Sequence, residues 1–106
     1  MTTLRGTGAA ALAAVPALAD LSDRVLFGEV WERDGLGKRD RSLVTVACLI
    51  ALARAEQLPF HLRTALANGV TRQELEEVVM HLAFYAGWPA AATAARLLAE
   101  LPSTRA

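Results

Sequence analysis

Glu77, His81 and Tyr85 follow one another at four-residue steps in a stretch with helical periodicity. Side chains four residues apart lie on the same face of a helix, so the carboxylate can orient the imidazole, with the phenol one turn further on. Because imidazole titrates near neutral pH, this trio favours general acid–base chemistry. The alternative is a solvated Glu–His pair beside a partly buried tyrosine.

His61 is the second of the two histidines and falls in the first turn of another expected helix. Free backbone amides and the helix dipole disfavour a protonated imidazole at that position. A neutral imidazole can accept a proton near pH 7, which makes His61 a candidate acid–base group. The alternative is a structural histidine that packs beside Phe60 and Leu62.

Four further side chains could bind a substrate. Arg39 and Arg41 lie in a charged cluster at an expected helix N-terminus, and a guanidinium matches the geometry of a carboxylate. Trp31 and Trp88 each adjoin an expected turn, where an aromatic ring can form the wall of a pocket. A solvated helix cap for the arginines, and core or interface packing for the tryptophans, are the alternatives.

Metal and thiol chemistry are disfavoured. The two histidines and Glu77 form no HExxH motif, so we expect no metal. Cys48 is the single cysteine; it lies in an apolar run over residues 43–52, where we expect it to be buried and unreactive. A lone cysteine fits a reducing compartment, and Pro16 interrupts the Ala-rich run that a secretion signal would need. We therefore expect a cytoplasmic protein.

Helical periodicity runs along nearly the whole chain and predicts an all-α fold with an antiparallel helical core. The helix expected over Arg39–Gln57 is the longest and is apolar on nearly every side, so we expect it to be central and buried. Thr71 and Glu74 form a capping box, which marks a helix start. The five expected helices run from Ala9 or Pro16 to Phe27, and over Arg39–Gln57, Pro59–Ala67, Thr71–Ala86 and Pro89–Glu100.

Composition limits the classes of partner. The 106 residues fit one domain, with a short tail over residues 102–106. Lys+Arg and Asp+Glu number 11 each, so the net charge of +0 disfavours nucleic-acid binding. No run reaches the roughly 18 apolar residues that a membrane span needs. Because 54% of the residues are hydrophobic, above the usual share of about 45–50%, we expect copies of the chain to associate.

Four sequence blocks resemble the carboxymuconolactone decarboxylase family, and the resemblance covers residues 12–98. The first block is FGEVWER at 27–33 and the second is RDRSLVT at 39–45. The third is HxxxALxNGVTxxE, which starts at His61, and the fourth is HLAFYAGWPAA, which starts at His81. The resemblance implies an alkylhydroperoxidase-like, all-helical fold that assembles into trimers or hexamers, with active sites near subunit contacts.

The family has two branches that differ in chemistry. Alkylhydroperoxidases place a CxxC pair seven and four residues before the histidine of the third block, where this chain has Arg54 and Gln57. The chain therefore resembles the branch without the CxxC motif, and a peroxide or quinone oxidoreductase is disfavoured.

The other branch resembles γ-carboxymuconolactone decarboxylase, a cofactor-free enzyme of aromatic-acid breakdown. The resemblance implies a lyase or isomerase acting on a small unsaturated carboxylic acid or lactone; an oligomeric small-molecule-binding or scaffold protein is the alternative. His61 would be the acid–base group, and His81 with Tyr85 would form a second set of donors. Arg41 or Arg39 would hold the carboxylate, and Glu77 would orient His81.

Overall fold

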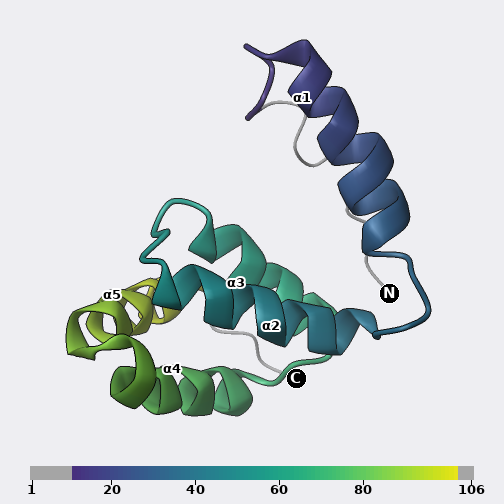
Figure 1. The fold of residues 1–106 in the computed structure, drawn as a ribbon. Helices are drawn as coiled ribbons and strands as arrows, with labels where there is room; N and C mark the ends of the chain where they lie inside the picture. Colours follow the sequence, from purple (N-terminus) through teal and green to yellow (C-terminus); the bar gives the residue numbers. More distant parts are fainter. Residues whose placement is uncertain (1–10, 103–106) are drawn as a thin grey trace.

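Short turns join the helices of this chain, as the periodicity predicts (Figure 1). The computed structural model describes residues 11–102, and in this range it contains helices and no strand. The all-α class is thus confirmed. In chain order the elements are α1 (Pro16–Leu21), the π-helical segment η1 (Ser22–Val30), α2 (Lys38–Ala51), α3 (Leu58–Ala67), α4 (Arg72–Ala86) and α5 (Trp88–Ala99).

Helix α4 begins and ends where its sequence signals lie. The Thr71 hydroxyl accepts a hydrogen bond from the Glu74 amide at 3.0 Å, and the Thr71 amide donates to the Glu74 carboxylate at 2.9 Å. These two bonds form the predicted capping box. Gly87 ends the helix with a φ of 106°, a value that other residues rarely adopt. Pro89 then lies in the first turn of α5.

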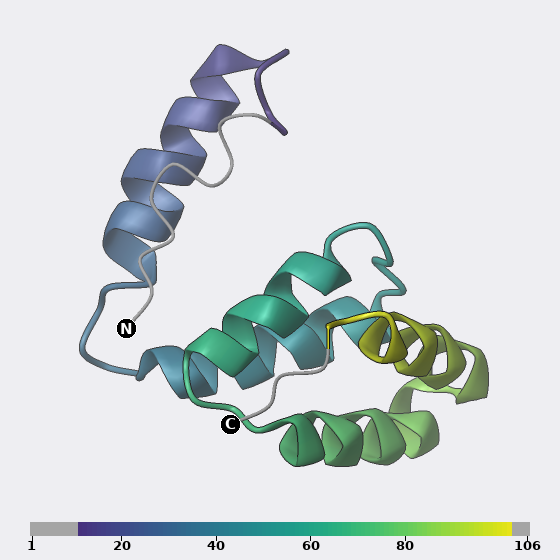
Figure 2. The same cartoon turned by 180° about the vertical axis from the view of Figure 1, so that it is seen from behind.

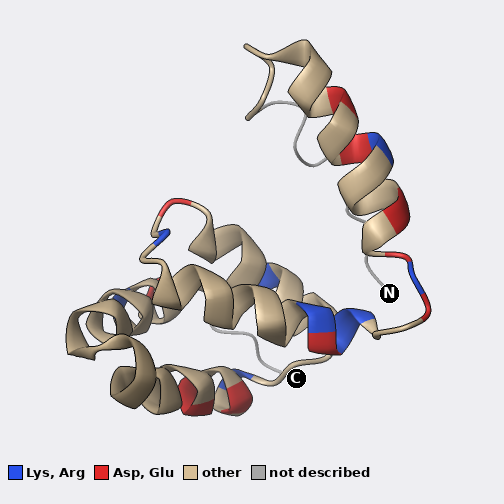
Figure 3. Ribbon diagram, viewed as in Figure 1, with Lys and Arg blue, Asp and Glu red and all other residues tan. Residues whose placement is uncertain are grey.

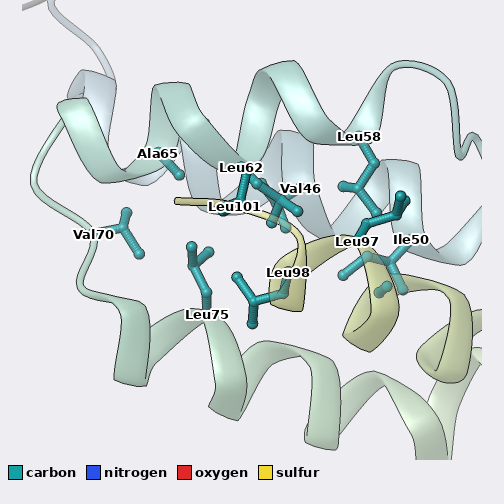
Figure 4. Close-up of a cluster of buried hydrophobic side chains, with 11 residues drawn as sticks. Val46, Ile50, Leu58, Leu62, Ala65, Val70, Leu75, Leu97, Leu98 and Leu101 are labelled. Carbon is teal, nitrogen blue, oxygen red and sulfur yellow. The ribbon is translucent and has the colours of Figure 1, made fainter. Parts of the chain in front are cut away.

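Helices α2 to α5 form a body around an aliphatic core (Figure 4). Leu62 from α3 and Leu75 from α4 are fully buried in it. A buried hydrogen bond of 3.1 Å from the Asn68 side chain to the Ser42 hydroxyl ties the end of α3 to α2. The core therefore fixes α2 and α4, the two helices that carry most of the candidate site residues.

The segments α1 and η1 form one continuous helical arm, residues 16–30, which projects from the body (Figures 1 and 2). Phe27 and Trp31 attach the arm by packing against Phe60 of α3. The helix expected to end at Phe27 continues to Val30 with π-helical turns, which the sequence did not indicate. The earlier start considered at Ala9 lies outside the described residues.

The prediction for the second helix was wrong at its end and in its burial. Helix α2 ends at Ala51 rather than Gln57, so its 14 residues make it shorter than α4 with 15. Ala53 adopts a positive φ of 58°, and this turn returns the chain antiparallel along α2. One face of α2 is open: the exposed fraction of Val44 is 62%, and Cys48 is exposed rather than buried.

Within residues 11–102, no helix is both long enough and apolar enough to cross a membrane.

Candidate active site

A groove of about 490 Å³ lies between α2 and α4. Leu43 and Ala47 of α2 and Val78 and Leu82 of α4 contribute apolar surface to it. Its volume is in the range of pockets that bind small molecules, roughly 300–1,000 Å³. The groove therefore has the size and the apolar character to bind a compact organic acid.

Glu77 and His81 line this groove, as their shared helix face predicts. Both side chains are exposed. The imidazole of His81 stacks on the Tyr85 ring with the centroids 4.8 Å apart and the planes at 28°. The predicted trio is thus arranged along one face of α4, with His81 in the groove and exposed.

Arg39 lies near one end of the groove. It forms an ion pair with Glu74 that joins α2 to α4. Arg39 lies one turn before Leu43, and Glu74 one turn before Glu77, which are the first groove residues of the two helices. The pKa of Glu74 is lowered by the hydrogen bond from the Thr71 amide and then by Arg39. Since 41% of its side chain is exposed, Arg39 can approach a ligand carboxylate at the groove end while it bridges the two helices.

Arg41 is engaged by the loop that joins the arm to α2. Its Nε donates to the carbonyl oxygen of Leu36 at 3.0 Å, and its Nη2 donates to that of Arg33 at 3.2 Å. These contacts make Arg41 a cross-link within the loop. Of the two arginines proposed to hold a carboxylate, Arg39 is thus the one beside the groove.

His61 lies in a different environment, where the arm meets the body. Its imidazole is half-buried and stacks on Trp31 with the centroids 6.0 Å apart and the planes at 15°. The Phe60 ring meets it edge-on at 4.9 Å. Its Nδ1 atom is buried and has no hydrogen-bond partner among the described residues. Burial lowers the pKa of His61, so its imidazole is neutral at pH 7.

The predicted histidines therefore fall in two separate groups of residues within this chain. Glu77, His81 and Tyr85 belong to α4, whereas His61 packs with Trp31 and is not among the residues that line the groove. Trp88 stands apart from both histidines: it is 66% exposed and meets Phe84 edge-on at 5.6 Å.

Sequence reasoning missed other residues around both histidines. Phe60 touches His61, and Val44 and Met80 help to line the groove. An aromatic residue directly before the histidine was the available signal for Phe60. Val44 and Met80 look like ordinary core positions, and only the packing of α2 on α4 shows that they border a cavity.

Among residues 11–102, no three His, Cys, Asp or Glu side chains gather closely enough to hold a metal ion.

The model of the carboxymuconolactone decarboxylase family matches residues 16–100. The chain belongs to this family. The match includes the arm, the whole groove and both histidines. The family assignment made from the four sequence blocks is therefore confirmed.

Curated relatives of this family protein include two named decarboxylases. Over 78 aligned residues the chain is 47% identical to the 4-carboxymuconolactone decarboxylase of Acinetobacter baylyi. The alignment covers 74% of this chain and 58% of the relative. Over 63 aligned residues it is 43% identical to the nitrosuccinic acid decarboxylase of Metarhizium robertsii. This alignment covers 59% of the chain and 44% of the relative. This family protein thus spans about half the length of these relatives.

Proposed function

We propose that this chain is a cofactor-independent carboxy-lyase that acts on a small unsaturated carboxylic acid or lactone, with His61 as its general acid–base group. Two relatives named as decarboxylases of small acids support this reaction class. The observation that carries the role of His61 is its half-buried imidazole, which is stacked on Trp31 and whose buried Nδ1 has no hydrogen-bond partner within residues 11–102. Buried unpaired nitrogens are rare in proteins, and perturbed groups gather at functional sites.

The reaction sets two chemical requirements. When the carbon–carboxylate bond breaks, CO₂ leaves and the electron pair passes into the unsaturated system as an enolate. A hydrogen-bond donor must stabilise the enolate oxygen, and a proton must reach the carbon that lost CO₂. Burial lowers the pKa of His61, so the imidazolium that forms when its ring takes a proton from water is a stronger acid than usual. It passes this proton to the carbon that lost CO₂ and returns to the neutral form.

The remaining candidates divide between binding and positioning. His81 and Tyr85 supply a second set of hydrogen-bond donors for the enolate oxygen, and Glu77 orients His81 from the preceding turn. Arg39 holds the substrate carboxylate at the groove end, while Arg41 keeps the neighbouring loop in place. Trp31 provides an aromatic wall beside His61, whereas Trp88, which contacts Phe84 apart from both histidines, takes no part in this proposal. The lone cysteine supports a cytoplasmic setting for this chemistry.

The test measures CO₂ release from 4-carboxymuconolactone and from nitrosuccinic acid, with His61→Gln as the matched variant. We expect turnover of the unsaturated lactone by the wild-type chain and its loss in His61→Gln. If neither acid yields CO₂, or if His61→Gln is as active as wild type, the proposal is wrong.

A second candidate function is small-molecule binding without catalysis. The observation in its favour is that His61 is not among the residues that line the groove in which an acid would bind. This function predicts that calorimetry detects binding of the same acids while no CO₂ appears. It also predicts that His61→Gln and His81→Gln bind them as tightly as wild type.

A further inference from the structure

We propose that the chain has a second ligand site, separate from the groove, which binds a small monocarboxylate with an apolar body. The site is a pocket of about 550 Å³ where the second half of α3, the turn before α4 and the chain after α5 come together. None of the residues that line this pocket lines the groove between α2 and α4. Binding in the pocket is therefore independent of the proposed function.

The surface of the pocket is largely apolar. Val70 and Leu101 are buried lining residues, and Leu66 and Pro102 add further apolar surface. A phenyl ring or a short alkyl chain that covers this surface releases water from it, which favours binding. The volume lies within the range of roughly 300–1,000 Å³ that is usual for small-molecule pockets. The apolar part of a small ligand is thus accounted for.

Two guanidinium groups border the same pocket, and the first is that of Arg63. Arg63 is exposed and has no hydrogen bond or ion pair within residues 11–102. Residues 58–71 contain no other charged residue, and Figure 3 shows α3 with basic but no acidic colour. The N–H groups of a guanidinium match the two oxygens of a carboxylate. Arg63 is therefore the anchor that we assign to the ligand.

Arg72 supplies the second guanidinium, which the protein holds in place. Its Nη2 donates to the carbonyl oxygen of Leu98 at 2.8 Å, and its Nε lies 3.9 Å from the carboxylate of Glu76. These contacts occupy only part of the five N–H donors of the group, and 36% of the side chain is exposed. Because the side chain is already ordered, Arg72 can receive a ligand at a small cost in entropy.

The charge balance of the pocket favours a ligand with one negative charge. Among the described residues, no Asp or Glu lines it. Glu74 and Glu100, which lie nearby in the sequence, each form an ion pair with another arginine. Glu76 offsets part of the charge of Arg72, so the charge of Arg63 is the one left without compensation.

These features select among possible ligands. An inorganic anion would leave the apolar surface of the pocket uncovered, and a neutral aromatic compound would leave Arg63 without a counter-ion. A monocarboxylate joined to a ring satisfies both parts of the pocket. Phenylacetate has this form and is the probe in the experiments below.

The first experiment titrates phenylacetate into the wild-type chain and follows the backbone amides by NMR. We expect saturable shifts at residues 69–72, with a Kd in the millimolar range that is usual for a ligand of about ten non-hydrogen atoms. Phenylacetamide, the neutral counterpart, and acetate, which lacks the ring, should each bind about tenfold more weakly. Shifts confined to the groove, or equal affinity for phenylacetate and phenylacetamide, contradict the proposal.

The second experiment repeats the titration with Arg63→Gln. We expect the Kd for phenylacetate to rise about tenfold, because a charge-assisted hydrogen bond is lost. Arg33→Gln is the matched control: it removes an exposed guanidinium from the loop after the arm, outside the pocket, and should bind like wild type. Equal affinity in Arg63→Gln and wild type, or an equal loss in the two variants, overturns the site.

A third variant, Arg39→Gln, separates this pocket from the groove. It removes the arginine beside the groove, so we expect it to leave the shifts at residues 69–72 unchanged. Loss of those shifts in Arg39→Gln would mean that the carboxylate binds at the groove, and the second site would be wrong. If neither acid yields CO₂ but phenylacetate binds through Arg63, the proposed function fails and the second site stands.

Discussion

His61 and His81 occupy contrasting environments on neighbouring parts of the fold. His61 lies where the arm meets the body, half-buried between aromatic rings, and its Nδ1 has no hydrogen-bond partner in the part of the chain that the structure describes. His81 is exposed along an apolar groove, beside a tyrosine and one turn from a carboxylate. The first environment favours the neutral imidazole of His61 through desolvation, whereas the second leaves the imidazole of His81 exposed along the groove. The contrast suits two different roles in one reaction.

Replacing the histidines one at a time gives the largest expected effects. We expect His61→Ala to lower kcat for 4-carboxymuconolactone by about 10²–10⁴-fold, the usual contribution of a general acid–base group, and His81→Ala to lie at the lower end of that range. Steady-state kinetics measure both. A larger loss in His81→Ala than in His61→Ala would reverse the assignment of roles.

A smaller effect is expected from Glu77→Gln, which keeps the shape of the side chain and removes the charge that we propose orients His81. We expect kcat to fall about tenfold with little change in KM, since residues that act through a partner contribute less than the partner itself. Glu76→Gln is the matched control, because Glu76 is equally exposed on α4 but does not line the groove. Equal kinetics in the two variants would remove Glu77 from the site.

The smallest expected effect is on stability against pH. Because burial lowers the pKa of His61 in the folded chain, the unfolded chain binds more protons as the pH falls below the unfolded value of about 6.5. The free energy of unfolding therefore decreases on acidification, and the loss is complete below the folded pKa.

Urea denaturation at pH 7.5 and 5.5 measures this loss. The difference in the free energy of unfolding between the two pH values should be smaller in His61→Gln than in wild type. An equal pH dependence in wild type and His61→Gln would show that burial of His61 is not linked to folding.

Some boundaries of the fold follow from local chemistry and others do not. The start of α4 could be predicted because Thr71 and Glu74 satisfy each other's backbone donors within four residues. The end of α2 could not, because residues 52–57 contain neither Gly nor Pro, and the turn depends on an alanine with a positive φ. Residues 52–57 favour a helix, but the packing of α3 against α2 requires a turn there. No local sequence pattern indicates this packing.

The same limit applies to the candidate site. Glu77, His81 and Tyr85 share one helix, so their spacing alone predicts their arrangement. The environment of His61 depends on Trp31, which lies 30 residues earlier, at the end of an unpredicted π-helical segment. The exposure of Val44 and Cys48 was missed for a related reason: an apolar side chain signals burial in some interface, but not whether that interface lies within one chain.

The two hydrogen bonds from Arg41 to the loop carbonyls have a consequence for the dynamics of the arm. They hold one end of the connection between the arm and α2, while the Trp31 contacts hold the other end. The direction of the arm is thereby set within the single chain. Removing these hydrogen bonds should broaden the range of arm directions without changing the aliphatic core of the body.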